Sequence, residues 1–241
     1  MTTLLVLGSK PDPALPPRSD VDAVACANAS GRSAADLGLP SPVLTAMSAV
    51  LTSGQPSGRH SLRALRGLRT EVLHMLPRHD RGGSAAKRLW RRARNFRMEP
   101  FWFRARLRAG GYRWERFETR PLAAYHELVL SLCGNDPELR AQFARKHPST
   151  GVFAVALALA DGRFDRVIVA GMSFELTHAY GDNPEIAARG TTASKHADTD
   201  VMVLARLARR GGLFTTEPIV AARAGVPIWP PGGPSRPRDA G

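Results

Sequence analysis

Residues 146–174 have the sequence KHPSTGVFAVALALADGRFDRVIVAGMSF and combine a polar turn, an apolar run and a β-branched run. The polar turn, 147–151, precedes the apolar run at 152–160, which predicts a buried helix. After a short break, residues 167–169 are β-branched, which predicts a buried strand. The stretch therefore predicts a helix followed by a strand of a parallel sheet, which is half of a βαβ unit.

The start of the predicted helix carries hydroxyl groups. Ser149 and Thr150 stand where an N-cap is expected, so their oxygens lie near backbone N–H groups that have no partner within the helix. These N–H groups and the helix dipole both favour negative charge. Ser149, Thr150 and Gly151 are therefore candidates for binding an anionic group.

Two further strand ends are predicted near the N-terminus. Residues 4–7 lead into Gly8 and Ser9, and residues 22–27 lead into Asn28. The glycine pattern of a Rossmann dinucleotide site, GxGxxG, is absent after Gly8. Ligands of open parallel sheets bind beyond the carboxyl ends of the strands, so we expect these three residues, together with Ser30 shortly after Asn28, on one edge. The alternative is that Gly8 only makes a turn and Asn28 only caps the helix that follows it.

The other segments complete an α/β pattern. Helices are predicted over residues 62–76, 85–108 with a break near Pro100, 122–133, 136–144 and 193–209, and a last strand over 213–216. Residues 42–51 are compatible with a strand or with the start of a helix. We expect one domain over 1–217, with a Rossmann-like, mostly parallel sheet and a basic helical insert over about 55–145. The Pro- and Gly-rich tail over 218–241 is expected to be disordered.

The basic charge of the chain is concentrated in one segment. The formal net charge is +13, and 18 of the 34 Lys and Arg residues lie in residues 59–120, with aromatic residues between them. This combination suits nucleic acid, acidic lipid headgroups or an anionic glycan as the partner. The alternative is a solvated arginine-rich surface without a partner.

Neither a disulfide framework nor a metal site is expected. Cys26 and Cys133 are the only cysteines and fit a reducing compartment. Asp198 and Asp200 lie two residues apart, but no further residues complete a ligand set. No apolar run is long enough to span a bilayer, and the chain begins with a strand rather than a signal peptide. We therefore expect a cytoplasmic protein, or one attached peripherally to the inner membrane.

Three titratable residues are predicted near the edge that carries Gly8 and Asn28. His178 and Tyr180 follow the strand at 167–169, and His196 stands in the first turn of a predicted helix. Histidine is the commonest general base, and Tyr and His donors near a helix start can stabilise a leaving phosphate. The set suits transfer from a nucleotide-activated donor to a hydroxyl acceptor. The alternative for His196 is a surface histidine that caps its helix.

The order of these motifs resembles the sialyltransferases, both the bacterial lipo-oligosaccharide enzymes and their animal relatives. The resemblance covers about 4–30 and 146–217 and leaves out the basic middle segment. Four motifs carry it in the family's order: 5–9 with 24–28, then 147–153, 178–180 and 195–200. Ser9 departs from the asparagine that is common in the family. Cys26 and Cys133 do not match the cysteine pair of the animal enzymes, which favours the bacterial type.

The resemblance implies a sialyltransferase-type fold, which is a variant of the GT-A architecture. It also implies an activity and the residues that catalyse it. The activity would be inverting, metal-independent transfer of sialic acid or a related 2-keto sugar acid from a CMP donor to a glycan hydroxyl. His196 would be the catalytic base, and Tyr180 and His178 would stabilise the departing CMP phosphate. No cofactor is implied beyond the CMP-activated sugar.

The resemblance also implies how the donor is bound. Gly8, Ser9 and Asn28 would face the cytidine nucleotide, and the turn at 149–151 would bind the donor phosphate or the sugar carboxylate. The acceptor would be an anionic glycan or glycolipid, such as lipopolysaccharide or capsule. The Arg-rich segment 59–120 would bind that acceptor or the membrane surface, and nucleic acid would not be a partner.

Two alternatives to the transferase remain from the sequence. One is a non-enzymatic basic α/β protein that binds nucleic acid or an acidic membrane surface through residues 59–120. The other is a hydrolase or phosphotransferase that acts on a nucleotide sugar. A pocket for cytidine is required by the transferase and by the enzyme of the second alternative, but not by the non-enzymatic protein.

Overall fold

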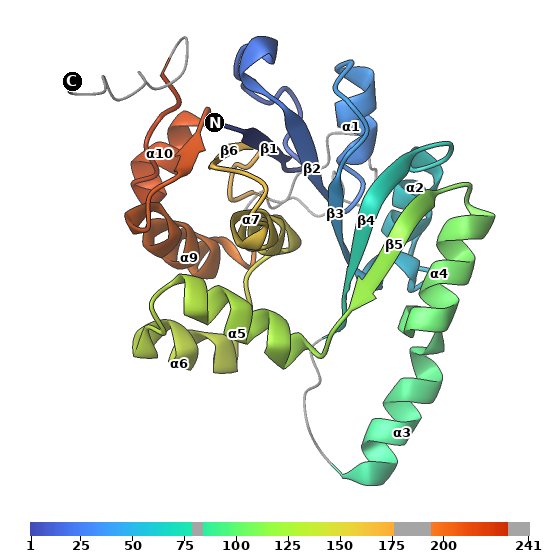
Figure 1. The fold of residues 1–241 in the computed structure, drawn as a ribbon. Helices are drawn as coiled ribbons and strands as arrows, with labels where there is room; N and C mark the ends of the chain where they lie inside the picture. The colour runs from blue at the N-terminus through green and yellow to red at the C-terminus, as the bar shows by residue number, and fades with distance from the viewer. Residues whose placement is uncertain (79–83, 176–193, 231–241) are drawn as a thin grey trace, which may run out of the picture.

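The computed structural model describes residues 1–78, 84–175 and 194–230, and its centre is a parallel sheet (Figure 1). The seven strands follow the order β5-β4-β3-β2-β1-β6-β7, and every neighbouring pair is parallel. The strands are β1 Thr3–Leu7, β2 Ala23–Ala27, β3 Leu44–Ser48, β4 Arg69–Leu76, β5 Arg113–Thr119, β6 Arg166–Ala170 and β7 Leu213–Thr215. The Rossmann-like α/β fold predicted from the sequence is confirmed.

Helices cover both faces of the sheet (Figure 1). The helices α5, α6, α7 and α9 lie on one face, and α1, α2 and α4 lie on the other. The helices are α1 Gly31–Asp36, α2 Pro56–Ala64, α3 Ala85–Arg94, α4 Pro100–Ala109, α5 Leu122–Leu132, α6 Pro137–Arg145, α7 Thr150–Ala160, α9 Ala197–Arg209 and α10 Pro218–Ala224. Short 3-10 turns are η1 Arg18–Asp20, η2 Ala49–Thr52 and η3 Phe96–Met98.

The central strands and α7 form the core. In β1, Leu4 and Val6 pack on the face covered by α7, whereas Leu5 and Leu7 pack on the opposite face. Successive side chains of a strand point to opposite faces, so a strand covered on both faces needs a continuous apolar run. Helix α7 lies between the sheet and the helices α5 and α9, which explains why it is apolar on all sides.

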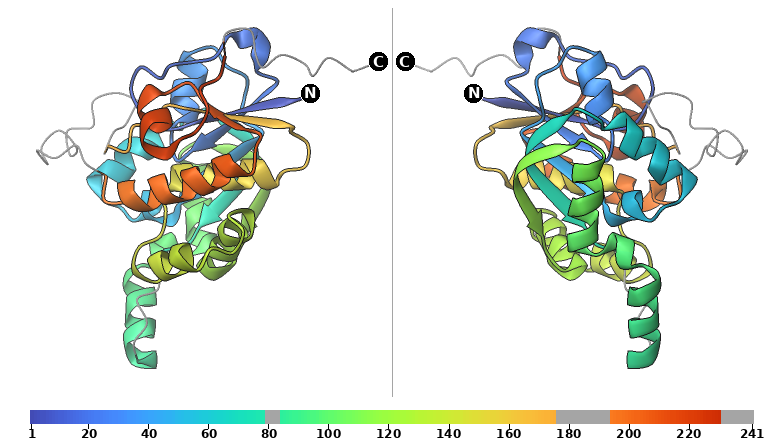
Figure 2. Two further views of the ribbon diagram at one scale, coloured as in Figure 1. Left: turned by 90° about the vertical axis from the view of Figure 1, so that its left-hand side faces the viewer. Right: turned by 90° about the vertical axis from the view of Figure 1, so that its right-hand side faces the viewer.

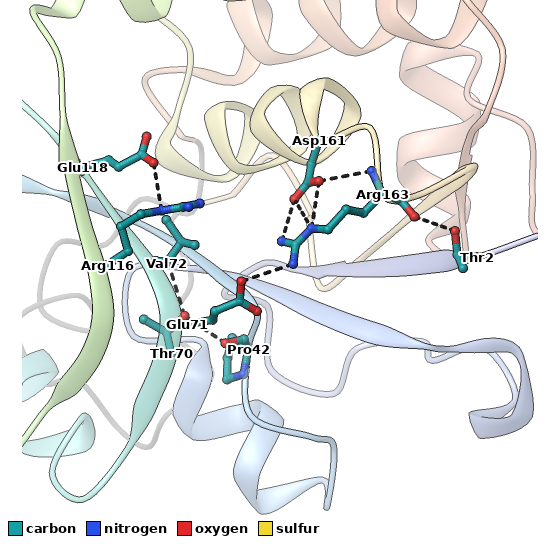
Figure 3. A network of polar contacts seen from close by, with 9 residues as sticks. All are labelled: Thr2, Pro42, Thr70, Glu71, Val72, Arg116, Glu118, Asp161 and Arg163. Atoms are coloured by element: carbon teal, nitrogen blue, oxygen red, sulfur yellow. Dashed lines mark hydrogen bonds and ion pairs between the residues drawn. The ribbon is translucent and has the colours of Figure 1, made fainter.

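A polar network holds the carboxyl end of α7 at the amino edge of the sheet (Figure 3). The Arg163 guanidinium lies 2.8 Å from Asp161 Oδ2, at the end of α7, and 3.1 Å from Glu71 Oε1 on β4. The hydroxyl of Thr2, before β1, donates to the Arg163 carbonyl at 2.7 Å. Because this end of α7 is held at the amino edge, its N-terminus points to the carboxyl edge of the sheet.

The prediction of a helix over residues 62–76 is wrong. Helix α2 ends at Ala64, Gly67 has a φ of +78°, and residues 69–76 form the strand β4 between β3 and β5. The strand is buried on both faces, and the resulting closely spaced apolar residues imitate a helical pattern. The ambiguous segment 42–51 forms strand β3 followed by η2.

The predicted insert and tail also need correction. Residues 55–145 do contain α2 to α6, but they also supply β4 and β5, so this segment is part of the sheet rather than a purely helical insert. The expectation of a disordered tail from residue 218 is wrong for residues 218–230. They form α10 and bring Trp229, which is buried, to the sheet, where its Nε1 donates to Asp20 at 2.9 Å. Residues 231–241 lie outside the described residues.

None of the helices within the described ranges has the length and apolar character needed to cross a membrane. Cys26 and Cys133 are both free thiols.

Candidate functional site

The strand order has a switch point between β1 and β6. From β1 to β5 each new strand is added on one side, and β6 then pairs with the other edge of β1. The connections on the two sides of such a point diverge, and ligands of open α/β sheets bind in the crevice between them. The carboxyl ends of β1 and β6, followed by Gly8 and Gly171, lie at this switch point, and we call this position the crevice.

Backbone atoms of two glycines form the floor of the crevice. A Cβ atom at Gly8 would lie 2.2 Å from the carbonyl oxygen of Gly171, so no other residue fits at position 8 without a shift of the backbone. Gly171 has a φ of +67°, which favours glycine, and its carbonyl accepts from the Lys10 N–H at 2.8 Å. Ser9, directly after Gly8, is partly exposed. Gly8 thus permits a close approach of two strand ends and does more than make a turn.

Asn28 joins the carboxyl ends of β2 and β3. Its φ is +53°, a conformation that asparagine tolerates better than most residues. Its side-chain Oδ1 accepts from the Ser48 N–H at 3.0 Å. The N-cap of α1 is Ser30 and not Asn28, so the alternative role of a helix cap does not apply. The structure places Asn28 on the same edge as Gly8, as the sequence predicts.

The N-terminus of α7 opens beside the crevice. Ser149 is the N-cap, and its Oγ accepts from the Val152 N–H at 3.4 Å. Thr150 and Gly151 are the first two helical residues, so their N–H groups have no acceptor within the helix. All three residues are partly exposed. They can therefore present two N–H donors and hydroxyl groups to an anion.

The Met172 side chain connects this helix start with the strand ends. A Cβ atom at Gly8 would lie 2.8 Å from Met172 Cγ, and one at Gly151 would lie 3.0 Å from Met172 Cε. Both glycines are therefore packed against the same side chain. The Met172 side chain therefore lies between the ends of β1 and β6 and the start of α7.

Asp200 holds the turn before α7. Its Oδ1 accepts from the Ser149 N–H at 2.7 Å, and its side chain is buried. Burial raises the pKa of Asp200 to about 7, although the hydrogen bonds from Ser149 act in the opposite direction. Asp200 thus fixes the turn with a carboxyl group whose burial favours the protonated form.

His196 is fixed by a backbone contact with the same turn. Its Nδ1 lies 2.8 Å from the His147 carbonyl oxygen, and the two imidazole rings are 5.0 Å apart between centroids. A carbonyl only accepts, so Nδ1 carries the hydrogen and the Nε2 lone pair remains to accept a proton. Burial lowers the pKa of His196 to about 4, and the positive charge of neighbouring residues adds to this effect.

The structure brings His196 to the polar turn at 147–151 through its contact with the His147 carbonyl, and the roles predicted for these residues stay predictions. His196 stands at the N-cap position of α9, but its side chain makes no cap hydrogen bond, so the alternative of a capping histidine does not hold. His178 and Tyr180 lie outside the described residues. The relation of these two residues to the site stays a prediction from the sequence.

Glu217 is a contributor that the sequence did not reveal. Its side chain has no exposed surface, and its carboxylate accepts from the Gly171 N–H at 2.9 Å and the Ala14 N–H at 3.0 Å. Lys10 Nζ lies 2.5 Å from the other oxygen of the carboxylate. Glu217 precedes the proline that starts α10, and this local position gives no indication that the side chain reaches back to the crevice.

A metal centre is not apparent in the parts of the chain that the structure describes. Within these ranges, no group of three or more His, Cys, Asp or Glu side chains is placed to hold a metal ion. The groups that meet at the crevice are N–H donors, hydroxyls, the two buried carboxyl groups of Asp200 and Glu217, and the imidazole of His196. Such a set can bind an anionic ligand and accept a proton beside it.

Solved structures of a sialyltransferase share this fold. A Cst-II variant in complex with CMP has a TM-score of 0.54 at 12% identity, covering 98% of this chain and 89% of that chain. A second Cst-II variant with CMP has a TM-score of 0.51 at 12% identity, covering 96% and 88%. CstII from Campylobacter jejuni in complex with cytidine-5'-monophosphate has a TM-score of 0.50 at 13% identity, covering 98% and 88%.

The chain therefore shares the fold of these sialyltransferase structures, as the sequence motifs predict. No protein-family model matches the sequence, and no curated protein matches it.

Proposed function

We propose that the protein transfers sialic acid or a related 2-keto sugar acid from a CMP donor to a hydroxyl group of a glycan. The observation that carries this proposal is the contact between His196 and the turn that leads into α7. Its Nδ1 contacts the carbonyl of His147, two residues before the cap Ser149. A proton acceptor and an anion-binding helix start are thereby held next to each other at the switch point of a sialyltransferase-like fold.

In the proposed reaction, His196 is the general base. Its Nε2 takes the proton of the acceptor hydroxyl while the acceptor oxygen attacks the anomeric carbon of the sugar acid. The bond between that carbon and the CMP phosphate oxygen breaks, and CMP departs with its electron pair from the opposite side, which inverts the configuration. A low pKa keeps the imidazole unprotonated at neutral pH, so the base can then accept a proton.

The donor is proposed to bind across the crevice. The N–H groups of Thr150 and Gly151 and the hydroxyl of Ser149 would hold the phosphate or the carboxylate, with the helix dipole in place of a metal ion. Gly8, Ser9 and Asn28 would face the cytidine, in keeping with their position at the ends of β1 and β2. The CMP complexes of the similar Cst-II structures support this choice of nucleotide.

Leaving-group stabilisation is assigned to Tyr180 and to His178. Both follow β6 in the sequence by fewer than a dozen residues, and β6 ends at the crevice. The acceptor is proposed to be an anionic glycan or glycolipid, because the excess of basic residues in 59–120 would attract it.

The donor site is tested by replacing one N–H group. Thr150 occupies the first helical position, where proline is well tolerated, and Ser149 before it is already extended, with φ −69° and ψ 164°. Thr150→Pro should therefore keep the fold while removing the N–H donor. Thr150→Val keeps that donor and removes only the hydroxyl, and serves as the matched control.

Calorimetric titration with CMP and with CMP-sialic acid is the measurement. Loss of a charge-assisted hydrogen bond costs about 1.5–3 kcal/mol, so Thr150→Pro should weaken binding by more than about tenfold, and Thr150→Val by less. Folding of both variants is checked by circular dichroism. Failure of the wild type to bind either ligand would contradict the proposal, as would equal affinities for Thr150→Pro and the wild type.

A further inference from the structure

The helix α3 and the start of α4 project from the body of the protein. Both views of Figure 2 show α3 running away from the sheet and its covering helices. The base of this projection is anchored, because Met98, Phe103 and Leu107 are buried in one core cluster with side chains of β3 and β4. We call residues 84–102 the projection.

Large apolar side chains of the projection are exposed. Of the ten exposed large hydrophobic residues in the described ranges, five lie in this short segment: Leu89 70%, Trp90 58%, Phe96 41%, Phe101 64% and Trp102 45%. Trp102 packs edge to face with Phe96 and Phe101, at centroid distances of 5.6 Å and 5.2 Å. An apolar groove runs between α3 and α4, lined by Leu89, Phe96, Phe101 and Trp102 among others. Contiguous exposed apolar surface of this kind marks a binding surface.

Basic residues border the apolar surface. Residues 85–108 contain nine Lys and Arg and a single acidic residue, Glu99. In α3, Leu89 and Ala93 lie one turn apart on one side, whereas Lys87 and Arg91 lie one turn apart on the other. The Arg94 guanidinium lies 4.4 Å from the ring centre of Trp90, where the two sides meet. This is the pattern of a helix that lies in a membrane interface, with apolar residues toward the acyl chains and cations toward the headgroups.

We propose that the projection docks the protein on an anionic lipid membrane, independently of the transfer activity proposed above. Two other partners fit less well. A second copy of the chain would bring two equally basic surfaces together, and like charges oppose that contact. Nucleic acid would satisfy the cations, but a groove with Leu89 and Phe101 offers little to a phosphate backbone. A bilayer with anionic headgroups satisfies both the charge and the apolar surface.

Two double variants separate the apolar and the charged contributions. Leu89→Ser with Phe101→Ser removes exposed apolar side chains, and Arg94→Glu with Arg97→Glu reverses exposed charge. The matched controls carry the same types of change elsewhere on the surface. They are Leu37→Ser with Ile219→Ser, and Arg209→Glu with Arg210→Glu.

The test is co-flotation of the full chain with vesicles, either of pure phosphatidylcholine or with about 30% phosphatidylglycerol. We expect binding to the anionic vesicles and little to the neutral ones. Each projection variant should lower the partition coefficient by about tenfold or more, and each control variant should leave it nearly unchanged. Added salt should weaken the binding that remains in the apolar variant.

Three results would overturn the proposal. The first is the absence of binding to anionic vesicles. The second is binding that the apolar variant leaves unchanged, which would indicate a merely electrostatic contact. The third is self-association in sedimentation velocity that the apolar variant abolishes, because the projection would then be covered by a second copy. Circular dichroism of each variant shows whether the fold is intact.

Discussion

The crevice at the carboxyl edge of the sheet and the projection of α3 and α4 differ in the burial of their polar side chains. At the crevice, Asp200 and Glu217 are buried and accept hydrogen bonds from specific backbone N–H groups. On the projection, Lys87, Arg94 and Arg97 are exposed, and the apolar side chains between them are exposed as well. One region is organised around a small ligand with defined geometry, and the other around an extended surface.

The difference shows why net charge alone is a poor guide to the site. The basic segment 59–120 contains most of the excess charge, yet the groups that can carry chemistry lie outside it. They gather where β1 and β6 diverge, because the parallel topology brings strand ends and helix starts to one edge. A buried carboxylate there affects the geometry of the site more than an exposed arginine does, because it is scarcely screened by solvent.

The largest expected effect is on the floor of the crevice. Gly8→Ala would place a methyl group 2.2 Å from the Gly171 carbonyl oxygen. This oxygen is a backbone atom, so the backbone would have to shift to make room. We expect a loss of about 4 kcal/mol or more in the free energy of unfolding, measured by urea denaturation. Gly151→Ala is the control, because its nearest contact would be the flexible end of Met172, at 3.0 Å, and the Ser149 Oγ would lie at an ordinary 3.6 Å. Similar stabilities of the two variants would contradict the described packing.

Two phenylalanines of α4, two positions apart, provide a second comparison. Phe103 is fully buried, whereas Phe101 is 64% exposed. Truncating a buried phenylalanine removes about 3–5 kcal/mol, so Phe103→Ala should destabilise the protein strongly. Phe101→Ala should change the free energy of unfolding by less than about 1 kcal/mol. A large loss from Phe101→Ala would mean that the projection is covered within the protein and is not available to a membrane.

The two titratable residues of the site should act on stability in opposite directions. Asp200 has a pKa of about 7 when folded and an ordinary value of 3.8, so the folded protein holds more protons between these values. Its contribution is therefore lost as pH rises toward and through about 7. His196 has a pKa of about 4 when folded and an ordinary value of 6.5, so its contribution is lost as pH falls through that window.

Single variants should reveal each contribution. Asp200→Asn keeps an oxygen that can accept from the Ser149 N–H, and His196→Gln keeps an N–H donor. Relative to the wild type, Asp200→Asn should gain stability between pH 4 and pH 7, by roughly 2–4 kcal/mol. His196→Gln should gain stability toward acidic pH, by a smaller amount because the histidine is partly solvated. Denaturation curves without these opposite slopes would contradict the described burial.

Much of the fold follows from local sequence, and the exceptions have a common cause. Helix α7 and strand β6 are recognisable because each is a continuous apolar run between polar turns. Strand β4 is not, because burial on both faces gives it apolar residues in no simple alternation. Strand β5 is also missed. It lies at the edge of the sheet and consists mainly of charged and aromatic residues, so it lacks the apolar run of a buried strand.

The site was predictable in its backbone elements and less so in its side-chain contacts. Gly8, Asn28, Ser149 and His196 stand at strand ends or helix starts, and these positions can be inferred from periodicity. The contact of Asp200 with Ser149 joins residues 51 positions apart, and that of Glu217 with Gly171 joins residues 46 positions apart. Such contacts depend on how α7, α9 and β6 pack, which no local pattern specifies.

The most direct test of the account is the rate of CMP release from CMP-sialic acid with a glycan acceptor, for the wild type and His196→Ala. A general base contributes about 10²–10⁴-fold, so the variant should be slower by at least about 100-fold with nearly unchanged donor affinity. His60→Ala, on α2 on the other face of the sheet, should match the wild type. For the wild type, kcat/KM should decline only as pH approaches about 4. Equal rates of CMP release for His196→Ala and the wild type would contradict the account.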